Sequence, residues 1–522
     1  MGSVLTTNAA KLSKLRQVIT ESLRVQRDGD PIEYINVGTA RDDACARQNH
    51  AIFARRGCGK TLLLHDSASH LRPDSAAIYL NCEDFKQHSF PNVLIEILSA
   101  LFREVKKNLP GWFGRRKKTR EMVEGILEKL AALQKSADEQ QEKVRRLNVD
   151  ENESQLDFDA GAKSDALSLN FKTKDRQAQK VEVERSFDVH KKKLQELDRW
   201  LPELKEQVRD AIGASNKVKT IFIQIDDLYH LRRTDQAFVV DYIHRLCKDL
   251  PLYFKIATLR HASTLYADRD GQPIGAQERH DYQPINIDYT FGDFQKTRSQ
   301  NLEIIYKFGT KAGVSKAEVD GLFKGEGFSR LVMAGGGVPR DVLSLFLEVL
   351  SDLDIVGGSR IGKDEVRILS KQNFERRIEE LKQDSQGEEQ DDLIKGIYII
   401  RTFCLDKKTN LFLVEERMLQ QNDEWRALFY RLLDYRIIHS CATALTHKSQ
   451  DGTYQAYAID IGCYAHLRKL EGRFNEIDVA SPGVKEKMRS APILDADKLS
   501  SLFKAVPENA EAALLQDDLE AA

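Results

Sequence analysis

The stretch His50-Ala-Ile-Phe-Ala-Arg-Arg-Gly-Cys-Gly-Lys-Thr-Leu-Leu-Leu64 decides the fold of this chain. It has the pattern of an apolar strand, a glycine-rich turn and the start of a helix. It matches the G-x-x-x-x-G-K-T pattern of a phosphate-binding loop except at Ala54, where the pattern has glycine. In such loops the backbone N–H groups of the turn and of the helix N-terminus face the phosphates. The residues predicted to bind a nucleotide are Arg56, Gly57, Cys58, Gly59, Lys60, Thr61 and Leu62.

Two side chains of this loop have separate predicted roles. Lys60 is expected to reach the outer phosphates of ATP, and the Thr61 hydroxyl is expected to ligate Mg²⁺. A chance Gly-Lys-Thr at a helix start is the alternative, and it is disfavoured because a strand precedes the loop and a helix follows it. Two interpretations of Cys58 stay open: a thiol whose pKa is lowered at a helix N-terminus, or a small residue that fits the turn.

Two further apolar runs, residues 75–82 and 220–227, are typical of buried parallel strands. The second ends in Asp226-Asp227, which places both carboxylates at the C-terminal edge of a sheet, beside the phosphates. Asp226 is the predicted metal residue, and Asp227 is predicted to polarise the attacking water. Because aspartate is shorter than the usual glutamate, slow turnover is expected. An acidic turn after an ordinary strand is the weaker alternative.

A fourth run, residues 253–260, ends in Thr258 and Arg260, which are predicted to sense the terminal phosphate. Strand, helix and strand in this order imply right-handed crossovers and a doubly wound parallel α/β sheet with helices on both faces. This core is assigned to residues 49–114 and 216–292. Residues 1–48 are assigned to a helical and connecting segment.

The residues 115–215, between the second and third strands, predict an inserted arm. Apolar positions step by three and four over residues 123–147 and again over 187–211. Two such seams in one chain favour an antiparallel coiled-coil hairpin, with a small β-hairpin at its tip near residues 156–171. At the base, residues 112–120 mix basic and aromatic side chains. This pattern suits nucleic acid or a membrane surface, and equally a solvated helix start.

The C-terminal half predicts two further units and a tail. Helical patterns over residues 294–312, 316–333, 339–353 and 363–381 indicate a helical lid at 293–382. After an acidic linker, residues 393–470 have the order of a winged-helix-like domain, with helices followed by a β-hairpin. Residues 481–522 are acidic and are predicted to form a mobile tail.

The composition indicates a soluble, cytoplasmic protein. The 522 residues are 41% hydrophobic and 31% charged, and their mean hydropathy is −0.47. No apolar run is long enough to cross a bilayer, so no membrane partner is expected. Seven scattered cysteines show no C-x-x-C spacing, which gives no indication of a zinc site or a disulfide framework. The net charge of −2 implies that any nucleic acid is bound by local patches.

Taken together, these motifs resemble an AAA+ ATPase. The loop, the Asp226-Asp227 strand, the Thr258-Leu-Arg260 strand end and Gly335-Gly-Gly-Val-Pro-Arg-Asp-Val-Leu343 carry the resemblance, which covers residues 35–110 and 216–380. The likeness is to the origin-recognition (initiator) clade and to STAND signalling ATPases. It implies that Arg340 is a sensor arginine in the lid and that the working form is a homo-oligomer. The arm departs from both patterns.

Two functions from different classes follow from these observations. The first is an oligomeric ATP-dependent switch that acts as a DNA-directed ATPase on double-stranded DNA, in a prokaryotic mobile-element or antiphage defence system. The second is a nucleotide-binding signalling scaffold with little turnover, which recruits an effector protein through its coiled-coil arm. An SMC-like ATPase ranks last, because the chain lacks its Leu-Ser-Gly-Gly signature.

Overall fold

A computed structural model gives the structure of the chain in several described stretches. The described residues are 2–23, 34–36, 38–85, 88, 90–107, 117, 119–135, 193–215, 217–269, 272–352, 359–384, 388–465, 474–481 and 483–515. The β-hairpin predicted near 156–171, the distal parts of both arm seams and most of the basic and aromatic segment at 112–120 lie outside these residues.

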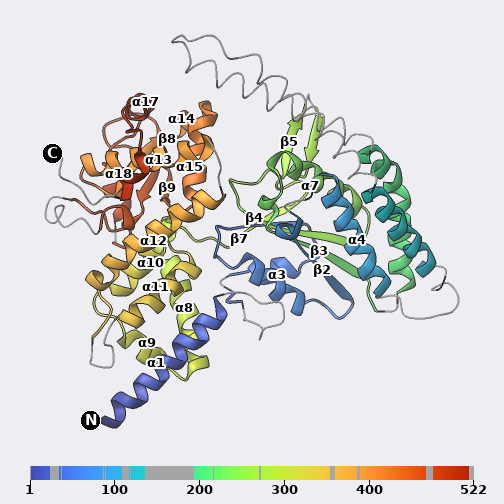
Figure 1. The fold of residues 1–522 in the computed structure, drawn as a ribbon, viewed down its shortest axis with the longest axis horizontal. Coiled ribbons are helices and arrows are strands. Elements are labelled where there is room, and N and C mark those ends of the chain that lie inside the picture. Colours follow the sequence, from blue (N-terminus) through green and yellow to red (C-terminus); the bar gives the residue numbers. More distant parts are fainter. Residues whose placement is uncertain are drawn as a thin grey trace, which may run out of the picture.

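A five-stranded parallel sheet forms the centre of the half that carries the predicted nucleotide residues, here called the nucleotide-binding half (Figure 1). Its strand order is β2-β3-β4-β1-β7, and every neighbouring pair is parallel. The predicted parallel α/β sheet is confirmed, and β7 is a strand that the sequence analysis missed. The strands are β1 (His50–Phe53), β2 (Ser75–Asn81), β3 (Thr220–Asp226), β4 (Leu252–Thr258) and β7 (Gln283–Asn286).

Alternate residues of β1 pack against helices on opposite faces of the sheet, as the period of two in a strand requires. Ile52 belongs to the cluster of α3 (Lys60–Ser69) and α2 (Ala40–Cys45), whereas Ala51 and Phe53 belong to that of α4 (Asn92–Lys107) and α7 (Arg233–Cys247). A hairpin of β5 (Tyr266–Arg269) and β6 (Gln272–Gly275) contacts α7. The phosphate-binding loop is therefore held between a buried strand and a buried helix.

The base of the predicted arm consists of two helical segments, residues 119–135 and 193–214. The Lys193 ammonium donates to the Leu133 carbonyl at 2.9 Å, and Lys129 pairs with Glu203 at 3.6 Å, so the segments run antiparallel. Their seam residues are buried in the same cluster as α4 and α7. The base is thus part of the core of the nucleotide-binding half.

A group of helices follows the sheet: α8 (Phe294–Ala312), α9 (Lys316–Gly321), α10 (Gly327–Ala334), α11 (Pro339–Asp352) and α12 (Lys363–Asp384). The single helix expected over 316–333 is wrong. The Lys324 N–H donates to the Ile361 carbonyl, and the Ile361 N–H donates to the Leu322 carbonyl, which interrupts the helix. The N-terminal helix α1 (Gly2–Ser22) packs on α8 and α11.

The C-terminal unit combines helices with a three-stranded antiparallel sheet of order β8-β10-β9 (Figure 1). The predicted hairpin forms, whereas β8 and α14 were not predicted. In chain order the elements are α13 (Glu388–Asp406), β8 (Leu411–Glu415), α14 (Glu416–Gln421), α15 (Asp423–Asp434), β9 (Ile438–Thr446) and β10 (Thr453–Ile459).

The prediction of a mobile tail is wrong for residues 483–515. These residues form α16 (Val484–Met488), α17 (Ala496–Lys504) and α18 (Ala510–Leu515). Leu494 and Leu499 are buried, and the Leu494 N–H donates to the Leu413 carbonyl of β8 at 2.8 Å. The acidic composition misled the prediction for this stretch, because apolar residues such as Leu494, Leu499 and Leu514 pack in the core of the C-terminal unit. Residues 516–522, which hold the last three acids of the tail, lie outside the described residues.

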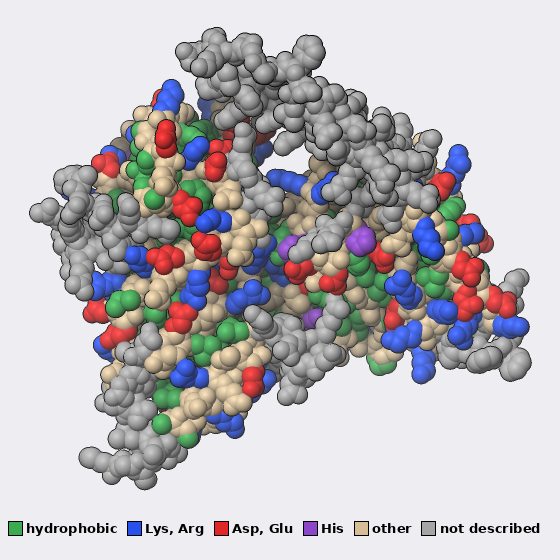
Figure 2. All heavy atoms as spheres, in the orientation of Figure 1, with side chains coloured by type: hydrophobic (Ala, Val, Ile, Leu, Met, Phe, Trp, Pro, Cys, Tyr) green, Lys and Arg blue, Asp and Glu red, His purple; other side chains and the backbone are tan. Residues whose placement is uncertain are grey.

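The surface carries both signs of charge. Figure 2 shows Lys and Arg side chains interspersed with Asp and Glu over the face that it draws, in keeping with the net charge of −2. Within the described residues, no helix is both long enough and apolar enough to cross a membrane.

Candidate nucleotide site

The phosphate-binding loop joins β1 to α3 through two glycines in the left-handed region. Gly57 has φ 85° and Gly59 has φ 92°, a conformation that L side chains rarely adopt. A Cβ atom on Gly57 would lie 2.8 Å from the Arg340 Cβ and 2.9 Å from the Val338 Cγ1. The Arg340 N–H donates to the Gly57 carbonyl at 3.3 Å. The start of α11 thus rests directly on the loop, and Arg340 lies beside Gly57.

A bidentate ion pair anchors the loop to Asp288, in the segment that follows β7. The Arg55 Nε and Nη2 donate to the two carboxylate oxygens of Asp288 at 2.7 and 2.8 Å, and the Arg55 backbone N–H donates to the same carboxylate. Although burial opposes it, the Arg55 charge lowers the pKa of Asp288. Asp288 lies two residues beyond β7, so the sequence analysis missed this anchor together with the strand.

Lys60, the first residue of α3, is buried beneath the turn of the loop. Its ammonium donates to the Ala54 carbonyl at 3.1 Å and to the Arg55 carbonyl at 3.4 Å. Burial lowers the pKa of Lys60, and the charge of Asp227 opposes this effect. The lysine therefore spans the loop and lies within the electrostatic reach of the strand that carries both predicted acids.

Asp226 and Thr61 come together from distant parts of the chain. Asp226 ends β3 and is buried, and its carboxylate accepts hydrogen bonds from the Thr61 hydroxyl and, at 2.8 Å, from the Tyr79 hydroxyl. Burial and the charge of Asp227 raise the pKa of Asp226 to about 6. A carboxylate beside a hydroxyl is the oxygen donor set that Mg²⁺ prefers, so these residues fit that ion. The sequence analysis missed Tyr79.

Asp227 and Arg56 share an aromatic neighbour. Asp227 is left-handed with φ 53°, and its N–H donates to the Asp226 carboxylate at 3.0 Å. The Arg56 guanidinium lies 4.9 Å from the centre of the Tyr229 ring. Burial and the charge of Asp227 raise the pKa of Tyr229. The backbone strain at Asp227 is of the kind that is found at functional sites.

The two residues at the end of β4 already have protein partners. The Thr258 hydroxyl is buried and hydrogen-bonds to the Ser263 hydroxyl. Arg260 lies 4.2 Å over the Phe53 ring and donates to Glu278 at 3.1 Å and to Asn286 at 3.2 Å. These contacts direct Arg260 toward β7 and toward a cavity of about 350 Å³ that it lines with Phe53 and Glu278. These contacts direct neither Thr258 nor Arg260 toward Lys60.

Cys58 is buried inside the loop, and its thiol donates to the Asp288 carboxylate. Burial raises the pKa of Cys58. Of the two open interpretations, the lowered pKa is therefore wrong, and the small residue that fits the turn remains. The thiol also holds the carboxylate that anchors Arg55.

Comparisons with known proteins find distant structural similarity and no match in sequence. No model of a known protein family matches the chain, and no curated protein matches its sequence. Among solved structures, a Walker-type ATPase of Pyrococcus abyssi is 12% identical over 80% of this chain and 91% of its own, with a TM-score of 0.34.

Two origin-recognition proteins are similar at the same level. The ORC1 protein of Aeropyrum pernix in complex with DNA is 12% identical over 89% of this chain and 92% of its own, with a TM-score of 0.30. Drosophila ORC bound to DNA is 12% identical over 86% of this chain and 91% of its own, with a TM-score of 0.31. Because these TM-scores are low, the function has to be argued from the residues of this chain.

Proposed function

We propose that this chain is an ATP-dependent switch of the AAA+/STAND type. One juxtaposition carries the proposal: Lys60, Thr61 and Asp226 lie together at the C-terminal edge of a parallel sheet. The edge of a parallel sheet outside its strand ends is where nucleotides bind in open α/β folds. The contact between Gly57 and the start of α11 supports a role for the following helices as a lid that responds to the nucleotide.

Each residue of the site has a role in this proposal. Lys60 leaves the Ala54 carbonyl and binds the outer phosphates, while Thr61 and Asp226 hold Mg²⁺, which neutralises phosphate charge when it is bound. Asp227 orients the attacking water, and Arg340 couples nucleotide binding to the position of the lid. Thr258 and Arg260 sense the terminal phosphate once Arg260 exchanges its contacts with Glu278 and Asn286. Turnover is slow, because Asp227 has a short side chain.

We further propose that the switch acts on double-stranded DNA as a homo-oligomer in the cytoplasm. The order of helices and strands from α13 to β10 supports a winged-helix-like domain, a class that often binds DNA. A prokaryotic mobile-element or antiphage defence system is the proposed setting. A signalling scaffold that recruits an effector through the arm is the second candidate, and the acids Asp423 and Glu424 at the start of α15 favour it because they repel phosphate.

ATP turnover with and without double-stranded DNA tests the proposal. We expect slow turnover that rises with DNA and is lost in Lys60→Ala, because the variant removes the cation that binds the outer phosphates. Asp226→Asn is expected to keep ATP binding in EDTA and to lose its enhancement by Mg²⁺. Tight ATP binding without DNA-stimulated turnover supports the scaffold instead. ATP binding that is equal in wild type and Lys60→Ala contradicts both candidates.

A further inference from the structure

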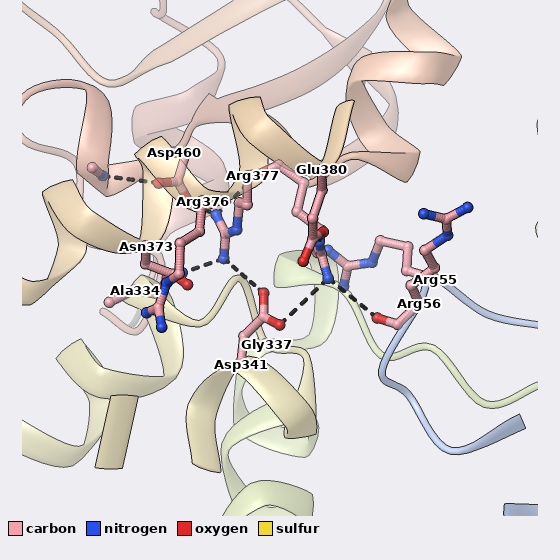
Figure 3. A network of polar contacts seen from close by, with 12 residues as sticks. Arg55, Arg56, Ala334, Gly337, Asp341, Asn373, Arg376, Arg377, Glu380 and Asp460 are labelled. Carbon is pink, nitrogen blue, oxygen red and sulfur yellow. Dashed lines mark hydrogen bonds and ion pairs between the residues drawn. The ribbon is translucent and has the colours of Figure 1, made fainter. Parts of the chain in front are cut away.

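A network of charges that is buried except at Glu380 connects the C-terminal unit to the phosphate-binding loop (Figure 3). Its central residue is Arg436, which lies between α15 and β9 and has a side chain that is 3% exposed. The Arg436 Nη1 donates to the Arg56 carbonyl and to the Asp341 carboxylate, each at 3.4 Å. The Arg436 Nη2 pairs with Glu380 of α12. One guanidinium thus contacts the loop, the start of α11 and α12.

A second arginine shares the same carboxylate. Arg377 of α12 donates to Asp341 at 3.2 Å, pairs with Asp460 and donates to the Arg436 carbonyl at 3.0 Å. Asp341 directly follows Arg340, the predicted lid sensor. Asp341 is neutralised by two arginines. Removing either one leaves this buried carboxylate with a single cationic partner, which is strongly unfavourable.

Arg436 is held in an unfavourable conformation. Its φ is +62°, in the left-handed region where any residue other than glycine is strained. Within the described part of the chain, its buried Nε has no hydrogen-bond partner. Strain and an unsatisfied donor persist only where the surroundings determine the conformation, and they gather at functional positions.

The helix before Arg436 adds one ring contact with the nucleotide-binding half, and it places a buried acid within electrostatic reach of the loop. The Tyr430 ring stacks on His261, with 4.1 Å between the ring centres, and His261 lies three residues beyond β4. Asp434, at the end of α15, is 7% exposed, and its electrostatic environment includes Arg55 and Lys60. The side of α15 that bears Tyr430 and Asp434 is therefore occupied by the chain itself.

We propose that Arg436 is a positioning residue for the phosphate-binding loop, supplied by the C-terminal unit. It holds the Arg56 carbonyl and, through Asp341, the start of α11, so the loop that receives the phosphates depends on the docking of α15. This inference deepens the proposed function and rests on it. Because coupling is reciprocal, nucleotide binding changes the docking of the C-terminal unit by the same free energy as docking changes nucleotide affinity.

The test measures ATP affinity by calorimetry and amide hydrogen exchange over residues 55–61 without nucleotide. In Arg436→Ala we expect about tenfold weaker ATP binding and faster exchange, because hydrogen bonds to a charged group are lost. Arg436→Lys keeps the charge but cannot span three acceptors, so we expect an intermediate effect. The matched control is Arg426→Ala on α15, whose guanidinium pairs with Asp423 at the surface, and we expect it to leave both readouts unchanged.

The outcomes separate this inference from the proposed function. In a folded Arg436 variant, unchanged ATP affinity or unchanged loop exchange overturns the inference. If Arg436→Ala does not fold, Arg436→Lys decides by the same criterion. If wild type and Lys60→Ala both fail to bind ATP, the proposed function fails. Exchange in the loop then decides alone: faster exchange supports a positioning role for Arg436, and unchanged exchange overturns it.

Discussion

Gly57 is a point of close approach between the phosphate-binding loop and the helix α11. A side chain there meets two obstacles: a positive φ, and the Val338 Cγ1 and Arg340 Cβ atoms at the start of α11. In the proposed function, a lid helix that approaches this closely transmits small movements of the loop. The same few residues would then make the nucleotide contacts and couple them to α11.

Gly57→Ala is expected to weaken ATP binding at least tenfold and to lower the free energy of unfolding by about 2–4 kcal/mol, because backbone strain adds to a clash. The matched control is Gly313→Ala. Gly313 has φ 76° with nothing within 4 Å of a built Cβ, so strain alone should cost about 1–2 kcal/mol with ATP binding unchanged. Thermal melts and calorimetry measure both effects. Equal losses in the two variants contradict the close approach.

The pKa of Asp434 predicts a pH dependence. Burial raises this pKa to about 7, above its value in the unfolded chain, so protonation favours the folded state. The stabilisation is full below the unfolded pKa and is lost as the pH rises toward 7. We expect Asp434→Asn to raise stability at pH 8 relative to pH 5, by about 3 kcal/mol at most. Denaturant melts at both pH values measure the gain, and an equal gain at both contradicts the burial of a neutral acid.

At the scale of elements, α17 illustrates how tertiary packing stabilises a segment with weak sequence signals. Leu499 is 1% exposed, and the Phe503 ring packs edge to face on Trp425 of α15. The N-cap residue of the helix is Asp495, whose side chain accepts a hydrogen bond from the Lys498 N–H. A short helix of this kind is not stable alone, so its order depends on the surface that it covers.

Leu499→Ala is expected to destabilise the C-terminal unit by about 2–5 kcal/mol, because it leaves a cavity in the core. Lys504→Ala, at an exposed position of the same helix, should change stability by less than about 0.5 kcal/mol. Differential scanning calorimetry compares the two variants. Indistinguishable melting temperatures of the two variants would support the mobile tail that the composition predicted.

At the scale of the whole molecule, the nucleotide-binding half and the C-terminal unit meet at the phosphate-binding loop. The loop contacts α11 through Gly57, Arg436 through the Arg56 carbonyl, and the segment that follows β7 through Asp288. A change at the loop therefore reaches three parts of the fold. This arrangement gives the proposed switch its means of converting ATP binding into a movement of the C-terminal unit.

The sequence by itself determined the parallel sheet and predicted the candidate nucleotide residues. Lys60 and Thr61 follow from a local pattern, and Asp226 follows from the end of an apolar run, because backbone geometry fixes such short motifs. The anchors Arg55–Asp288 and Tyr79–Asp226 join residues more than one hundred positions apart, so no local pattern predicts them. β7 was missed because Gln-Pro-Ile-Asn is not an apolar run.

Only the tertiary structure decided what surrounds the loop. Arg436 carries no motif, and its contacts with Arg56, Asp341 and Glu380 arise because two distant units pack together. The partners of Arg260 and the burial of Cys58 are likewise consequences of packing. A phosphate-binding loop is specified by its backbone and a few neighbours in sequence, whereas a buried charge network exists only once the chain brings its members together and excludes water.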